Sequence, residues 1–104
     1  DKSALLRCSY YEVEFSVLYD NYMCYCYILL CSDHKTYIGG TNDLKDRIQR
    51  HQKGYVEATK NRLPVTLITY FAFSTEHTAF NFEQYLKSGS GRAFLKKHSI
   101  SNGT

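Results

Sequence analysis

The stretch from Tyr25 to His51, YCYILLCSDHKTYIGGTNDLKDRIQRH, constrains the fold of this chain more than any other. It lies within a segment whose start, residues 23–31, is apolar at successive positions and rich in aromatic and branched side chains. That pattern is typical of a central strand that is buried on both faces. A polar turn at 32–35 and a second short strand, closed by the glycines of 36–40, are predicted to complete a hairpin.

A helix is predicted to follow the hairpin directly. Thr41 and Asn42 are both suitable N-cap residues, and Gly54 is well placed to end the helix. Arg47 lies beside the apolar stripe of this helix. The stripe consists of Leu44, Ile48 and His51. The tyrosines of the hairpin are therefore expected to face a helix that carries an arginine and a histidine one turn apart.

The remaining segments alternate between strand and helix patterns. Residues 10–17 alternate in polarity as a half-buried edge strand does, and residues 65–73 are typical of a largely buried strand. A helix capped by Ser74 or Thr75 is predicted to run to about residue 88. Gly89-Ser90-Gly91 then interrupts it, and Ser90 is expected to cap a final helix over 91–98.

These elements predict an α+β fold, in which a small central antiparallel sheet is flanked by helices. The element order is β-β-β-α-β-α-α. We expect an accessory segment with an edge strand at 1–22, one domain at 23–98 and a flexible tail at 99–104.

Charge is distributed unevenly along the chain. The net charge is +3, yet residues 1–33 contain two Lys and Arg against five Asp and Glu, whereas residues 34–104 contain eleven against five. The basic part carries the helix with Arg47 and His51, so a polyanion is the expected partner. A solvated surface that happens to be basic explains the charge equally well.

Composition also excludes some classes of protein. No apolar run approaches the roughly 20 residues of a membrane-spanning helix, so no membrane association is expected. The four cysteines do not have the spacing of a structural zinc site. We expect them to be reduced, buried thiols in a cytoplasmic protein.

Several short motifs together connect this pattern to a known family. Tyr37-Ile38-Gly39 follows Tyr25-Cys26-Tyr27, with the two motif tyrosines ten residues apart, and Arg47 and His51 come next. Their order resembles the GIY-YIG nuclease superfamily. Residues 82–92, FEQYLKSGSGR, resemble its small stand-alone branch, which is related to the nuclease domain of bacterial excision repair. The first motif departs from the family name, because Tyr and Cys replace Gly and Ile.

The resemblance implies a role for each candidate catalytic residue. One of Tyr27 and Tyr37 deprotonates the attacking water, with Tyr27 the preferred base, and Arg47 binds the scissile phosphate. His51 hydrogen-bonds to a catalytic tyrosine or water, and Glu83 binds Mg²⁺ or Mn²⁺. From the residues alone, a histidine in this position is more often a satisfied core residue. Glu83 is equally explained as a partner of Arg47 or as a residue at the solvent edge of its helix.

Nucleic-acid contacts are expected at a further set of residues, some of which are equally explained as a mobile basic loop. They are Lys35, Thr59, Lys60, Arg62, Arg92 and Lys96. Gly40 is a departure from the family, because some relatives have a lysine at this position.

The predicted function is metal-dependent hydrolysis of phosphodiester bonds in DNA, with DNA repair among the implied roles and RNA left open as a substrate. Two other classes fit the same sequence. One is a nucleic-acid-binding module that keeps the fold without turnover, and the other is a protein-interaction domain that docks through its acidic first strand.

Overall fold

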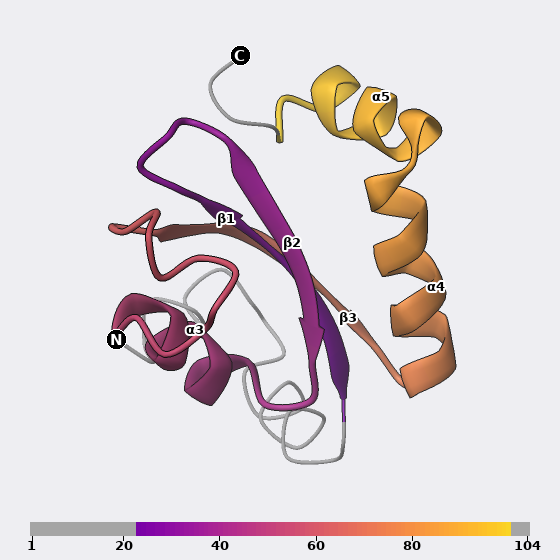
Figure 1. Cartoon of the computed structure of the whole chain (residues 1–104). Coiled ribbons are helices and arrows are strands. Elements are labelled where there is room, and N and C mark those ends of the chain that lie inside the picture. Colours follow the sequence, from indigo (N-terminus) through magenta and orange to yellow (C-terminus); the bar gives the residue numbers. More distant parts are fainter. Residues whose placement is uncertain (1–22, 101–104) are drawn as a thin grey trace, which may run out of the picture.

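The structure, a computed structural model, describes residues 23–100, in which a three-stranded antiparallel sheet carries helices on both faces (Figure 1). The elements are β1 (Cys24–Leu30), β2 (Thr36–Thr41), α3 (Leu44–Gln52), β3 (Thr66–Phe73), α4 (Glu76–Lys87) and α5 (Gly89–Lys97). The strand order is β2-β1-β3, so the strand predicted to be central is central and the α+β class is confirmed. The edge strand predicted at 10–17 lies outside the described residues.

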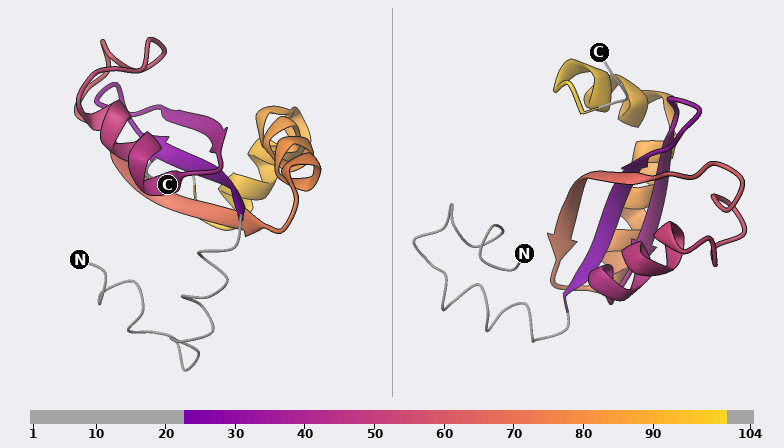
Figure 2. Two further views of the ribbon diagram at one scale, coloured as in Figure 1. Left: turned by 90° about the horizontal axis from the view of Figure 1, so that it is seen from below. Right: turned by 90° about the vertical axis from the view of Figure 1, so that its left-hand side faces the viewer.

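Two apolar clusters hold the helices to the sheet, one on each face. Tyr25, Tyr27 and Leu29 of β1 are buried on the face that carries Leu44 of α3. Cys26 and Ile28 point to the other face, where Leu86 of α4 and Leu95 of α5 cover them. Figure 2 shows the resulting layers, with α3 on one side of the sheet and α4 and α5 on the other. Because β1 alternates between two apolar faces, it can only be the middle strand.

The hairpin places the two motif tyrosines on the same face of the sheet. Leu30 pairs with Thr36, so residues 31–35 form a five-residue loop. In the same register Tyr27 lies opposite Gly39, and Tyr37 lies opposite Leu29. Because side chains alternate along a strand, an odd loop of this length brings both rings to the α3 face at diagonal positions.

Helix α3 begins and ends for identifiable reasons. Its N-cap is Asp43, not Thr41 or Asn42 as predicted, and the Asp43 side chain accepts a hydrogen bond from the backbone N–H of Asp46 at 3.1 Å. Thr41 instead caps the turn before the helix, because its hydroxyl accepts from the N–H of Asp43 at 3.0 Å. Gly54 ends the helix as predicted, with the positive φ of 81° that glycine adopts without strain.

A single serine separates the last two helices. Thr75 caps α4, as predicted, whereas α5 is capped by Ser88 and not by Ser90. The Ser88 hydroxyl accepts from the N–H of Gly91 at 3.2 Å and donates to the carbonyl of Tyr85 at 2.6 Å. This double use of one hydroxyl lets α5 start at Gly89, two residues earlier than expected, and turns it sharply against α4.

The described part of the chain ends at Ile100, beyond the start of the predicted tail. Its N–H donates to the carbonyl of Leu95 at 2.8 Å, and its side chain packs on the cluster formed by α4 and α5. The rest of the predicted tail lies outside the described residues. None of the helices in residues 23–100 has the length and apolar character needed to cross a membrane.

Gly91 provides a test of the close packing between α4 and α5. A Cβ at this position would overlap the carbonyl oxygen of Tyr85 and the Cα of Leu86, both of which are backbone atoms. Gly91→Ala is therefore expected to lower the free energy of unfolding by about 2–3 kcal/mol. Gly89 is the matched control, because a Cβ there meets no atom within 4 Å. In urea unfolding, Gly89→Ala should be neutral or stabilising, and equal effects of the two changes would contradict this packing.

Candidate active site

A chain of two buried hydrogen bonds connects β1, α3 and the loop after α3. The Tyr27 hydroxyl lies 2.8 Å from Nε2 of His51, and Nδ1 of His51 lies 2.7 Å from the hydroxyl of Thr59. All three residues are fully buried, with 0% relative exposure. Because the polar side-chain atoms of these three residues all have hydrogen-bond partners, burial does not leave a donor or acceptor unsatisfied.

Burial shifts the pKa values of Tyr27 and His51 in opposite directions. It raises the pKa of Tyr27 to about 12, and the neighbouring Tyr37 adds to the increase while the charge of Arg47 opposes it. Burial also lowers the pKa of His51, and the charge of Arg47 lowers it further. Both groups are therefore neutral at pH 7, and His51 can accept a proton through one ring nitrogen.

Tyr37 lies on the more open side of the same cluster. Its ring centroid is 5.2 Å from that of His51 and 6.3 Å from that of Tyr27. Tyr37 is only half-buried, whereas Tyr27 has no exposed surface. The structure thus brings together three of the candidate catalytic residues and gives the two tyrosines different access to solvent.

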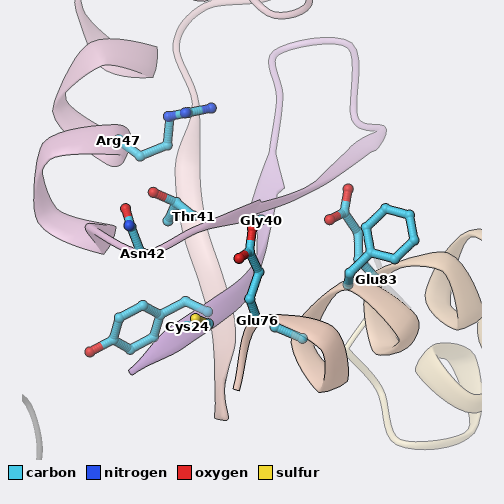
Figure 3. Close-up of a pocket in the computed structure, with 10 residues that line it drawn as sticks. Cys24, Gly40, Thr41, Asn42, Arg47, Glu76 and Glu83 are labelled. Atoms are coloured by element: carbon cyan, nitrogen blue, oxygen red, sulfur yellow. The ribbon is translucent and has the colours of Figure 1, made fainter. Parts of the chain in front are cut away.

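Arg47 and Glu83 line one pocket of about 380 Å³ at the C-terminal end of β2. Figure 3 shows Arg47 extending from α3 and Glu83 from α4, on either side of the segment that carries Gly40 and Thr41. We call this cavity the Arg47–Glu83 pocket. Arg47 and Glu83 line one pocket without forming an ion pair with each other, so the two side chains can contact different groups of one ligand.

The two glycines of β2 bring the tyrosine cluster and the Arg47–Glu83 pocket close together. A Cβ on Gly39 would lie 2.6 Å from the hydroxyl of Tyr27, and a Cβ on Gly40 would lie 2.6 Å from Oε1 of Glu83. Consecutive residues of a strand face opposite sides of the sheet. One glycine therefore admits the phenol from the α3 side, and the other admits the carboxylate from the α4 side.

Glu83 is paired with a lysine of its own helix. Its Oε2 lies 2.9 Å from Nζ of Lys87, one turn along α4, and its side chain is 16% exposed. Of the alternatives left open for Glu83, the pair with Arg47 is therefore not found. A lysine at Gly40, as some relatives have, would need the space that the Glu83 carboxylate occupies here. The cation beside Glu83 comes from α4 instead.

The residues expected to contact nucleic acid separate into three groups. Lys35, Arg92 and Lys96 are exposed and line a second cavity, next to Tyr37. Lys60 and Arg62 are held in ion pairs, with Glu57 at 3.1 Å and Asp33 at 2.8 Å. The prediction that Thr59 contacts nucleic acid is corrected. Its hydroxyl is fully buried and bonded to His51, so it orients the imidazole and does not reach a ligand directly.

Sequence reasoning missed two charged residues of α4. Glu76 lines the Arg47–Glu83 pocket, and Lys87 neutralises Glu83. Glu76 stands seven residues before Glu83, which is two helical turns, and Lys87 stands four residues after it. Both spacings place the side chains on the same face of the helix, so helical periodicity could have identified them.

Comparison with known proteins identifies the family of this chain. The family model described as the GIY-YIG catalytic domain matches residues 23–97. A UPF0213 protein of Pediococcus pentosaceus is 41% identical over 81 residues, covering 74% of this chain and 85% of that protein. A UPF0213 protein of Lacticaseibacillus paracasei is 36% identical over 80 residues, covering 73% and 90%. The solution NMR structure of a UPF0213 protein from Bacillus halodurans is 33% identical, covers 78% of this chain and 87% of that one, and has a TM-score of 0.49. The chain belongs to the GIY-YIG catalytic domain family.

Proposed function

We propose that this protein is a divalent-metal-dependent endonuclease that hydrolyses phosphodiester bonds in DNA. Membership of the GIY-YIG family implies nuclease chemistry on nucleic acid. One observation supports the assignment of the mechanism: Arg47, Glu83 and the Tyr27–His51 pair lie close together around Gly39 and Gly40. An arginine fork suits a phosphate, and a hydrogen-bonded tyrosine and histidine suit proton transfer from water.

The carboxylates of α4 fit a hard, oxygen-preferring ion such as Mg²⁺ or Mn²⁺. Glu83 and Glu76 are the ligands available in the Arg47–Glu83 pocket. Residues 23–100 contain no group of three or more side chains that could hold a metal, which suits an ion that keeps several waters and binds phosphate oxygens. When bound at Glu83, such an ion would neutralise negative charge on the leaving oxygen.

In this proposal the buried hydrogen-bond chain accepts the proton of the attacking water. If Nδ1–H of His51 donates to the Thr59 hydroxyl, then the lone pair of Nε2 faces the phenol of Tyr27. Because Tyr27 has no exposed surface, the attacking water has to reach its hydroxyl from the more open side of the cluster, at Tyr37. Tyr27 then takes a proton from this water while it passes its own proton to His51. Arg47 binds the non-bridging oxygens of the phosphate as negative charge grows on them.

Energetics favour this transfer over a free phenolate. With a pKa of about 12, only about one Tyr27 in 10⁵ is ionised at pH 7. Ionising the phenol at this pH therefore costs a free energy of about 7 kcal/mol. Handing the phenol proton to His51 in the same step avoids populating the phenolate. Tyr37, on the open side of the cluster, is placed to position the water.

Removal of the Glu83 charge should separate catalysis from folding. Glu83→Gln keeps the size of the side chain and an oxygen for Lys87, so the thermal midpoint should change little, since a partly exposed ion pair contributes about 0–1 kcal/mol. Cleavage in Mg²⁺ or Mn²⁺ should fall at least about 100-fold, as expected for loss of a group that acts in the transition state. The assay is a panel of DNA and RNA substrates, with EDTA as the metal-free control.

Glu57→Gln is the matched control, because Glu57 also pairs with a lysine but is exposed and lies outside the pocket. It should cleave like the parent protein. Full cleavage by well-folded Glu83→Gln protein would refute the metal role. If the parent binds DNA in EDTA yet cuts none of the substrates with either metal, the protein is a binding module.

The pH dependence of cleavage tests the proton acceptor. Because the pKa of His51 is lowered, the imidazole is neutral above its ordinary pKa of 6.5 and becomes protonated only at lower pH. The single-turnover rate should therefore be flat from about pH 7 to pH 9 and should fall as His51 is protonated below about pH 6.5. A rate that rises tenfold per pH unit up to pH 9 would identify a free Tyr27 phenolate as the base. The thermal midpoint at each pH controls for unfolding.

A further inference from the structure

A basic groove lies beside the Arg47–Glu83 pocket, along the other half of β2. It encloses about 520 Å³ and is lined by Thr36, Tyr37 and Ile38 of β2, together with Leu95 of α5. Its charged lining residues are Lys35, Lys87, Arg92 and Lys96. No acidic residue of the described chain lines it. The basic groove therefore combines positive charge with the apolar side chains of Ile38 and Leu95.

Three of these four cations are available to a ligand. Lys35, Arg92 and Lys96 are exposed and form no ion pair with any acidic residue of segment 23–100. This distinguishes them from Lys60 and Arg62, whose charges Glu57 and Asp33 neutralise. Three positive charges around one cavity repel each other, so an anion that binds among them relieves an unfavourable arrangement.

The basic groove continues the Arg47–Glu83 pocket. Glu83 lines the pocket and Lys87 lines the groove, and the two are joined by the 2.9 Å ion pair. Tyr37 lines the groove while its ring packs on His51. From Gly40 in the pocket to Thr36 in the groove, four residues of strand span about 13 Å. One strand of a duplex rises about 3.4 Å per phosphate, so this distance corresponds to about four nucleotides.

We propose that the basic groove is a second phosphate-binding subsite, which holds the polynucleotide backbone within about four nucleotides of the phosphate that is cut. This inference rests on the proposed function, because it takes the Arg47–Glu83 pocket as the place of cleavage. The groove contacts the backbone through charge, so it contributes affinity without reading base sequence.

The test is a pair of charge-matched double variants. Arg92→Gln with Lys96→Gln removes two charges from the groove. Arg50→Gln with Lys53→Gln removes two from exposed positions in the last turn of α3 and at its C-cap, and neither residue lines a cavity. Binding of a fluorescent DNA of about 20 nucleotides is measured in EDTA at several salt concentrations. The groove variant should bind about tenfold or more weakly, and its salt slope should decrease by about 1.4–1.8, the loss of two phosphate contacts. The α3 variant should stay within about threefold of the parent.

A small substrate separates this subsite from the catalytic residues. Thymidine 5′-p-nitrophenyl phosphate carries one phosphodiester and is too short to reach the groove from the pocket. Its hydrolysis by the groove variant should match the parent. Equal loss of DNA binding in both double variants, or loss of small-substrate hydrolysis in the groove variant, would overturn the proposal. If the parent hydrolyses neither substrate, the proposed function fails, and the binding comparison still decides whether the groove holds DNA.

Discussion

The absence of two side chains on β2 is the constraint on which the rest of the site depends. Gly39 and Gly40 face opposite sides of the sheet, and each leaves just enough space for one functional group, the Tyr27 hydroxyl or the Glu83 carboxylate. Stacked sheets normally lie about 10 Å apart, because side chains fill the space between the layers. Here two bare backbone positions let groups from both layers approach one strand. The proposed site is thus assembled across the sheet and not on one face of it.

In the proposed function, this arrangement assigns proton transfer to one face of the sheet and metal binding to the other. On the α3 face, burial keeps Tyr27 and His51 neutral and fixes their hydrogen bonds, with Thr59 completing the chain. On the α4 face, Glu83 stays partly exposed and its charge is compensated by Lys87. Proton transfer benefits from a dry, ordered environment, whereas a metal ligand has to remain ionised and accessible. The sheet separates these two requirements while keeping the groups close.

The sequence predicts the elements of this fold better than the contacts between them. The apolar run before residue 31, Gly54 and Thr75 are local signals, and the structure agrees with each of them. The caps of α3 and α5 differ from prediction, because Asp43 and Ser88 compete with equally good neighbours and the path of the preceding chain decides between them.

The misplaced site residue follows from the same limit. Thr59 sits in a loop with the composition of a surface contact, and only the folded path of that loop brings its hydroxyl to His51. No local pattern shows that a loop threonine will be buried against a helix eight residues earlier. The same-face placement of Tyr27 and Tyr37 depends on the parity of the hairpin loop, which has five residues and not the four of the turn predicted at 32–35.

The most direct test of a site assembled across the sheet is Gly40→Ala, measured for metal-dependent cleavage, Mn²⁺ affinity and thermal midpoint. The added methyl group would lie 2.6 Å from Oε1 of Glu83, the end of a flexible side chain, and 3.6 Å from the backbone carbonyl oxygen of Tyr25. The fold should therefore survive while the carboxylate is displaced, with cleavage and Mn²⁺ binding each reduced at least about tenfold. A folded Gly40→Ala protein that binds Mn²⁺ and cuts DNA like the parent would contradict the account.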